Sequence, residues 1–277
     1  MHIGIITCEI LREEIRAVIE ETGIDNVFLV LPESLNPVIC VLNKEVTDRF
    51  LGNLAKCGLK TREKTFERIV REIREDNITD SLIIKVTELR LHDYPDKLLA
   101  EIEGGLKQLS SVADFVLLGY GLCGSSAKDM ENVIQSAKVP VGIPRDIKGE
   151  ILNNCIEIAL GKEKVQSLLR EEIGTFFMTP AGAAIIKEPQ VILQSSINIT
   201  AGHMNQSAIA DTRNIINVLK SHYNRVVKIC YSEADETNVE FAKTVKKFAR
   251  EFNLEIKQVK GSSKRMLDAL ASARNPH

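Results

Sequence analysis

Along most of the chain, short continuous apolar runs alternate with segments whose apolar positions recur every three or four residues. The runs are typical of strands buried in a parallel sheet, and the helical spacing is typical of helices packed against one. The predicted strands are residues 2–7, 26–31, 81–86, 115–118, 140–144, 174–179, 225–231 and 254–259. The predicted helices are residues 10–19, 44–76 with a break at 58–60, 95–109, 126–137, 151–159, 165–171, 205–222, 238–252 and 263–273. This alternation predicts a Rossmann-like α/β fold with a mostly parallel sheet flanked by helices.

The segment 180–202 follows neither pattern, and we expect a domain boundary near it. A chain of 277 residues can bury one large core or two modest ones. Residues 1–190 are therefore expected to form an α/β lobe, and residues 191–277 a smaller βαβα lobe. The alternative is one continuous domain whose sheet crosses this boundary.

Composition restricts the class of protein more than its function. Hydrophobic residues make up 44% of the chain and charged residues 27%, which is ordinary for a globular protein. The net charge of −2, with both signs interspersed, gives no electrostatic footprint for nucleic acid. The N-terminal MHIGIITCEI has no basic leader, so we expect neither a signal peptide nor a membrane anchor, and a cytoplasmic location. The expected partner is a small molecule or another protein, and a homo-oligomer is left open.

The stretch GYGLCG contains Gly119, Gly121 and Gly124, and it lies between a predicted strand and a predicted helix. Such turns are found at the carboxyl ends of parallel strands, where ligands bind in open α/β sheets. One interpretation is a phosphate cradle for a dinucleotide, with Asp146 about twenty residues downstream as the ribose contact. It predicts an oxidoreductase that uses nicotinamide or flavin.

The other interpretation of the same turn is that it presents the thiol of Cys123. Cys8 ends the first predicted strand and Cys123 follows a later one, so both could lie at one edge of the sheet. Cys155 sits in a predicted helix that is entered through Asn153-Asn154. Helix N-termini are expected to stabilise thiolates, the form that binds metal or attacks an electrophile, whereas ordinary burial of a small apolar residue is the simpler alternative.

Other candidate residues have weaker patterns. Glu9 follows Cys8 at a helix start, where it could act as a base beside the thiol or only complement the helix dipole. His203 follows Gly202 and either faces a ligand cleft or caps a helix. Cys40 is a reserve ligand, and Cys57 and Cys230 are expected to serve packing.

Several blocks of the sequence together resemble the uncharacterised domain-of-unknown-function family 1638. They are ITCEILREEI, LLGYGLCG, Pro144-Arg145 followed by NNCIEIALG, GTFFMT and AREFNLEIKQVKGS. The family pattern has cysteines that match Cys8, Cys123 and Cys155, so the resemblance implies that these three act together. The chain departs from the pattern where Asn153-Asn154-Cys155 replaces His-Asp-Cys, and where SLNPV at 34–38 replaces a Leu-His-x-x-Pro stretch.

Genes of this family often accompany corrinoid-dependent methyltransferase systems in methanogenic archaea and anaerobic bacteria. The resemblance therefore implies a metal centre, an iron–sulfur cluster or zinc, held by Cys8, Cys123 and Cys155 and supporting methyl transfer in one-carbon metabolism or methanogenesis, with a corrinoid acting in trans. Its remaining position would belong to Cys40, an exogenous ligand or solvent. The protein is then a methyltransferase or an accessory redox protein. The alternatives are a non-enzymatic metallochaperone or corrinoid-protein partner, and a thiol enzyme with Cys123 as nucleophile.

Overall fold

The computed structural model describes residues 1–30, 61–87, 91, 94–186 and 222–275. The chain forms two compact units. Unit 1 consists of Met1–Ala159 and Ser263–His277, and unit 2 consists of Leu160–Ser262. No helix in the described ranges is both long and apolar enough to cross a bilayer.

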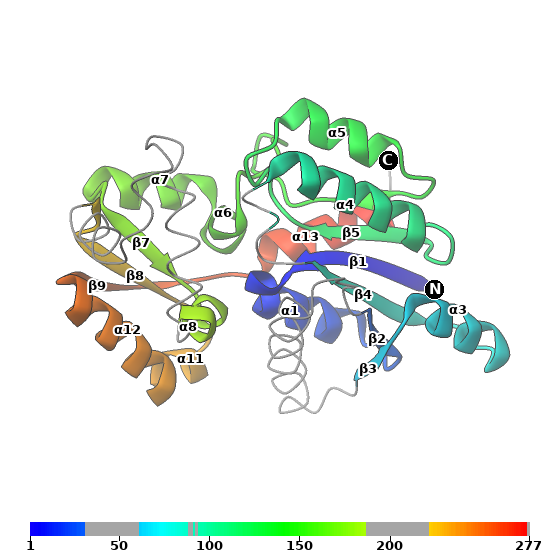
Figure 1. The fold of residues 1–277 in the computed structure, drawn as a ribbon, viewed down its shortest axis with the longest axis horizontal. Helices are drawn as coiled ribbons and strands as arrows, with labels where there is room; N and C mark the ends of the chain where they lie inside the picture. Colours follow the sequence, from blue (N-terminus) through cyan, green and yellow to red (C-terminus); the bar gives the residue numbers. More distant parts are fainter. Residues whose placement is uncertain (31–60, 88–90, 92–93, 187–221, 276–277) are drawn as a thin grey trace, which may run out of the picture. The chain divides into compact units, whose positions relative to one another are not determined.

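Within the described residues, unit 1 contains a parallel sheet of six strands in the order β3-β2-β4-β1-β5-β6 (Figure 1). The strands are β1 (His2–Cys8), β2 (Val27–Val30), β3 (Thr61–Lys64), β4 (Ser81–Thr87), β5 (Phe115–Gly119) and β6 (Val141–Gly142). The central strands β1, β4 and β5 are buried over almost their whole length. Their continuous apolar sequence follows from this position, because both faces of such a strand are covered.

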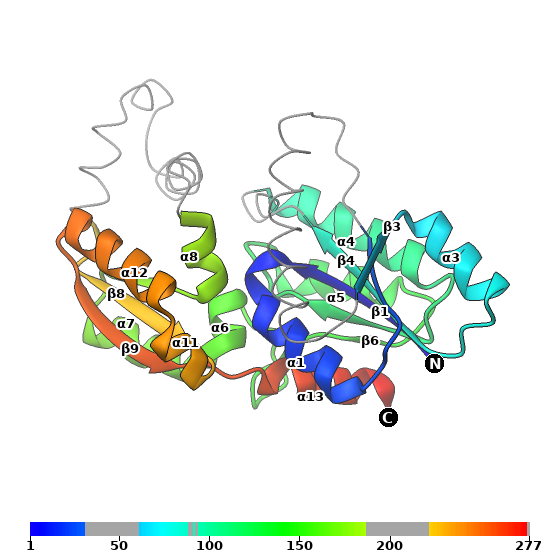
Figure 2. The same cartoon turned by 90° about the horizontal axis from the view of Figure 1, so that it is seen from below.

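Helices cover both faces of this sheet. The helices of this unit are η1 (Glu9–Leu11), α1 (Arg12–Thr22), α3 (Phe66–Glu75), α4 (Pro95–Leu109), α5 (Ala127–Gln135), α6 (Cys155–Leu160) and α13 (Lys264–Arg274). Helices α1 and α13 lie on one face, and α4 and α5 on the other (Figures 1 and 2). The fit of α4 is tight, since a Cβ added at Gly105 would lie 2.8 Å from the side chain of Ile6. Helix α13 contacts β5 and β6, with Met266 close to Gly119.

The strand register determines what meets at the carboxyl edge of the sheet. Cys8 pairs with Thr87 of β4, and Thr7 pairs with Gly119 of β5. The end of β1 and the turn after β5 are therefore neighbours. This edge is where open α/β sheets bind ligands.

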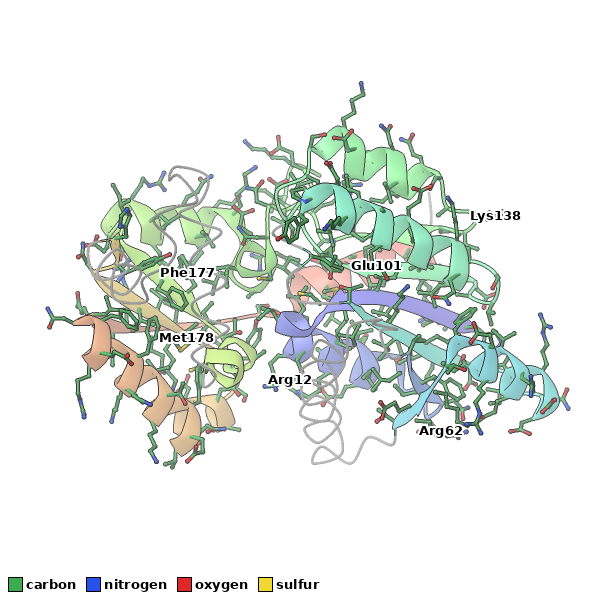
Figure 3. All side chains as sticks on the ribbon, viewed as in Figure 1. Arg12, Arg62, Glu101, Lys138, Phe177 and Met178 are labelled. Carbon is green, nitrogen blue, oxygen red and sulfur yellow. The ribbon has the colours of Figure 1, made fainter. Side chains whose placement is uncertain are left out.

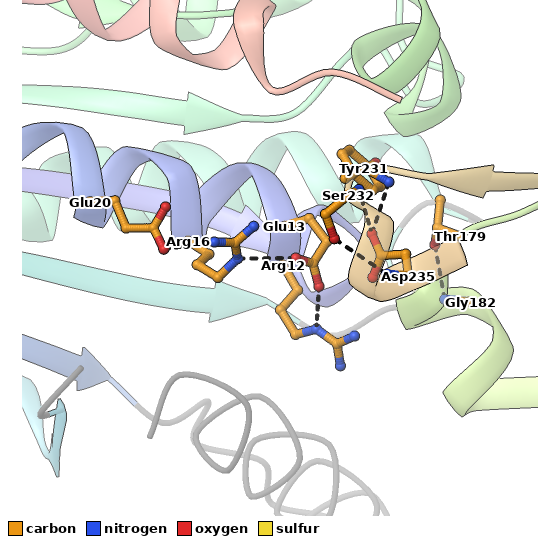
Figure 4. Close-up of polar contacts among 9 residues, drawn as sticks. All are labelled: Arg12, Glu13, Arg16, Glu20, Thr179, Gly182, Tyr231, Ser232 and Asp235. Carbon is orange, nitrogen blue, oxygen red and sulfur yellow. Dashed lines mark hydrogen bonds and ion pairs between the residues drawn. The ribbon is translucent and has the colours of Figure 1, made fainter. Parts of the chain in front are cut away.

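Unit 2 contains a parallel sheet with the described strands in the order β7-β8-β9. Its elements are α7 (Lys162–Glu171), β7 (Thr175–Met178), α8 (Pro180–Ile186), β8 (Arg225–Cys230), α11 (Glu233–Thr237), α12 (Val239–Phe252) and β9 (Glu255–Lys260). Helix α12 packs three phenylalanines, Phe241, Phe248 and Phe252, into the core of this unit. Ser232 and Asp235 form a capping box at the start of α11 (Figure 4).

The α/β class and the parallel sheet are confirmed, but two predictions differ from the structure. Residues 61–64, expected to be helical, form β3, where the charged sequence TREK is tolerated because the strand pairs within the described sheet only with β2. The units divide at 159/160 and 262/263, whereas we expected a boundary at 190/191. The C-terminal helix α13 returns to unit 1 because its apolar residues, Met266, Ala269, Leu270 and Ala273, are buried there.

Candidate functional site

Three cysteines from distant segments converge at the carboxyl edge of the large sheet. Cys8 is the last residue of β1, Cys123 lies in the turn after β5, and Cys155 is the first residue of α6. All three are thiols. Charges on Cys8 and on Cys123 each raise the pKa of Cys155, an effect that operates only between close neighbours. We call these three residues the thiol cluster.

The glycine turn brings Cys123 to the segment that carries Cys155. The backbone N–H of Leu122 donates to the carbonyl of Leu152 at 2.8 Å, and that of Cys123 donates to Asn153 at 2.7 Å. A Cβ added at Gly121 would lie 2.5 Å from the oxygen of Leu152. Only glycine therefore permits this approach of two backbones, and the glycine here serves packing between protein segments.

The other two glycines of the turn have related roles. A Cβ added at Gly119 would lie 2.5 Å from Oγ1 of Thr7, the residue before Cys8. Gly124 has a φ of 88°, and Cys123 itself has a φ of 46°, in the left-handed region that non-glycine residues seldom adopt. Such backbone strain at a non-glycine residue is found preferentially at functional sites. The strained conformation at Cys123 is consistent with a role for its thiol.

These contacts favour the thiol interpretation of GYGLCG over a phosphate cradle. Protein atoms occupy the space beside Gly119 and Gly121. Oδ1 of Asp146, the expected ribose contact, accepts the backbone N–H groups of Lys148 at 2.8 Å and Glu150 at 3.0 Å. Asp146 thereby holds a turn of its own chain.

Asn153 and Asn154, which replace His-Asp in the family pattern, fix the start of α6. Oδ1 of Asn154 accepts the backbone N–H groups of Ile156 and Glu157, both at 3.0 Å. Asn153 donates to the carboxylate of Glu157 through its backbone N–H at 2.8 Å and its side-chain amide at 3.0 Å. The two asparagines therefore act as a helix cap that positions Cys155.

Burial controls the acidity of the cluster. Cys123 and Cys155 are partly exposed as residues, yet burial raises the pKa of the Cys123 thiol to about 11. A backbone hydrogen bond from Gly121 lowers this pKa, but by less than burial raises it. The pKa of Cys155 lies well above its ordinary value, first because the thiol is buried and then because of charges on Cys8, Cys123 and Glu14. We expected helix starts to stabilise thiolates. At Cys155, burial and neighbouring acids outweigh that effect.

Sequence reasoning missed two buried groups beside the cluster. Tyr120 hydrogen-bonds to Thr87, which donates to the carbonyl of Thr7 at 3.3 Å. Burial raises the pKa of Tyr120, and the charge of Cys8 adds to this effect, as do those of Cys123 and of Glu101 on α4 (Figure 3). The second group is Glu14 of α1, which is fully buried. Its position among the apolar residues of the helix was the available signal, since a carboxylate there is unusual.

The remaining predicted residues are less informative. Glu9 begins η1, directly after Cys8. His203, Cys40 and Cys57 lie outside the described residues. Cys230 is buried at the end of β8 in unit 2. Across the described ranges, no group of three or more His, Cys, Asp or Glu side chains is placed so that it could hold a metal ion.

The raised pKa of Cys123 predicts a steep pH dependence for its alkylation by iodoacetamide in the metal-free protein. Because the thiolate is the reactive form, the rate should rise about tenfold per pH unit until the pH approaches the pKa of about 11. Mass spectrometry of the peptide that contains Cys123 measures this rate. The protein unfolded in denaturant is the control, where the rate should level off above about pH 8.5. A similar plateau in the folded protein would contradict the prediction.

Comparison with known proteins identifies the family of this chain. The family model described as "Protein of unknown function (DUF1638)" matches residues 86–270. No curated protein matches the chain. The matched range contains Cys123 and Cys155 of the thiol cluster, and Cys8 precedes it. Because the match covers more than half of the sequence, the chain belongs to the DUF1638 family.

Proposed function

We propose that this protein holds a metal centre, zinc or an iron–sulfur cluster, on the thiol cluster and supports corrinoid-dependent methyl transfer in one-carbon metabolism. The observation that carries the proposal is the meeting of Cys8, Cys123 and Cys155 from three distant segments, close enough for their charges to interact. The methyl-transfer part rests on the family resemblance.

The chemistry of the donor set fits a soft or borderline cation. Three thiols lie together in surroundings that disfavour their ionisation, since burial raises the pKa of both Cys123 and Cys155. A bound cation compensates thiolate charge, so metal binding would proceed with release of the thiol protons. In the described structure no group of three such side chains is placed to hold a metal ion, so metal binding would require the three thiols to come closer together.

When bound, zinc would activate an incoming thiol as a methyl acceptor, and a cluster with three cysteine ligands would leave one iron open. The residues of this chain would hold the centre and restrict its surroundings. Gly121 and the Asn154 cap position Cys123 and Cys155, while the buried Tyr120 keeps a phenol hydroxyl beside the cluster.

A metal-free mechanism with Cys123 as nucleophile is less well supported. With a pKa of about 11, only about one Cys123 thiol in ten thousand is ionised at pH 7. A thiol nucleophile needs a nearby base or cation to lower that value. Within the described structure, the pKa of Cys123 is lowered by a backbone hydrogen bond from Gly121, and this bond does not supply the base or cation that a thiol nucleophile needs.

The test uses methylcob(III)alamin as the methyl donor and a low-molecular-weight thiol as the acceptor. We expect the metal-loaded protein to demethylate the corrinoid faster than the metal-free protein, as followed by visible absorbance, and Cys123→Ser to remove the difference. Equal rates with and without metal would contradict a methyltransferase. In that case, a stoichiometric complex with a corrinoid protein would support the alternative, a metallochaperone or partner protein.

A further inference from the structure

Two of the three thiols lie on chain segments that are hydrogen-bonded to each other. The backbone N–H of Cys123 donates to the carbonyl of Asn153 at 2.7 Å, and Asn153 is two residues before Cys155. A Cβ added at Gly121 would lie 2.7 Å from the backbone nitrogen of Asn154. The glycine turn therefore lies directly against the start of α6, and this contact brings the backbones of Cys123 and Cys155 close together.

The side chains of these two cysteines have matching surroundings. Cys123 and Cys155 are both partly buried and pack against the same hydrophobic core, whereas Cys8 is buried within that core. The charge of Cys123 acts on Cys155, as expected for neighbouring side chains. A reagent in solution therefore has better access to Cys123 and Cys155 than to Cys8.

We propose that Cys123 and Cys155 are a reversible redox pair, which a low-molecular-weight disulfide oxidises to an intramolecular disulfide. The thiolate of one cysteine attacks the reagent, forms a mixed disulfide and releases one reduced thiol, and the second cysteine then displaces the other half of the reagent. Two protein thiols and one reagent disulfide thus become one protein disulfide and two reagent thiols. The inference goes beyond the proposed function, because it uses two thiols and needs no metal.

The surroundings of the pair favour its oxidised form. A disulfide is a strong oxidant when its reduced form is stabilised, as it is where the protein stabilises a thiolate. Here burial disfavours the thiolates, since it raises the pKa of both Cys123 and Cys155. The dithiol should therefore be a good reductant, and its disulfide should be hard to reduce. Because that disulfide occupies two sulfurs of the thiol cluster, its formation would also block the metal centre proposed there.

The test exposes the reduced, metal-free wild type to oxidised glutathione without oxygen, followed by mass spectrometry of its peptides. We expect the peptides of Cys123 and Cys155 to be cross-linked, with a mass lower by two hydrogen atoms than their sum. Two of the six thiols of the chain should be lost in a thiol titration. Absence of a cross-link, glutathione bound to Cys123 alone, or a cross-link that includes Cys8 would overturn the inference.

A second measurement tests the direction of the redox equilibrium. In a mixture of reduced and oxidised glutathione, the cross-link between Cys123 and Cys155 should persist, and dithiothreitol should remove it because its dithiol is a stronger reductant. Complete loss of the cross-link in the glutathione mixture would overturn the assignment of the pair as a reducing couple.

Variants separate this inference from the proposed function. Cys123→Ser and Cys155→Ser should each abolish the cross-link, whereas Cys8→Ser should keep it and lose the metal, since a metal centre on the cluster needs all three thiols. A cross-link in a wild type that binds no metal would support the redox pair and contradict the metal centre. Metal binding without a cross-link would do the reverse. The peptide map of the wild type decides the matter even if a variant does not fold.

Discussion

Replacing Gly121 with alanine should lower the free energy of unfolding of the protein by about 3 kcal/mol. The added Cβ would lie 2.5 Å from the oxygen of Leu152 and 2.7 Å from the backbone nitrogen of Asn154. Both atoms belong to backbone, which cannot rotate away as a flexible side chain can. The turn must therefore move from the segment that carries Cys155, with loss of the hydrogen bond from Cys123 to Asn153.

Gly104→Ala is the control for this substitution. Gly104 lies within α4, and no heavy atom is within 4 Å of a Cβ added there. Because alanine favours helix more than glycine does, this variant should be more stable by about 0.5–1 kcal/mol. Chemical denaturation measures both. Equal stability of Gly121→Ala and the wild type would show that the turn does not need glycine for close packing.

Much of the large sheet could be predicted from the sequence because its central strands are buried on both faces. The run Phe115–Leu118 is continuously apolar and forms most of β5, and the predicted bounds 95–109 match those of α4. The strand β3 could not be predicted from its sequence, since TREK has neither an apolar run nor alternation. This strand lies at one end of the sheet as described, where it pairs with β2. Its conformation therefore depends on a tertiary contact and not on its own sequence pattern.

The site could be predicted in part for the same reason. Parallel strands end at one edge, so the proximity of Cys8 to the turn of Cys123 follows from the order of elements. The approach of Cys155 depends on backbone contacts at Gly121 that no periodicity reveals. Glu14 was missed because charged residues on helices usually face solvent, although its spacing from Val18 and its place beside Ile15 put it on the apolar face of α1, where it is buried.

The central claim predicts that Cys123→Ser loses nearly all metal, by at least about 100-fold in affinity. Serine keeps the size of the side chain but replaces the soft sulfur ligand with a hydroxyl, which binds zinc and iron poorly at neutral pH. Cys230→Ser is the control, because Cys230 is also a buried thiol but belongs to the sheet of unit 2. It should keep the full metal content.

The most direct test is the content of metal and inorganic sulfide, with an absorption spectrum, in protein purified without oxygen. We predict near-stoichiometric zinc, or iron with sulfide, in the wild type and in Cys230→Ser, and its absence from Cys123→Ser. Zinc would identify a mononuclear site, whereas iron with sulfide would identify an iron–sulfur cluster. A colourless, metal-free wild type, or metal retained by Cys123→Ser, would contradict the account.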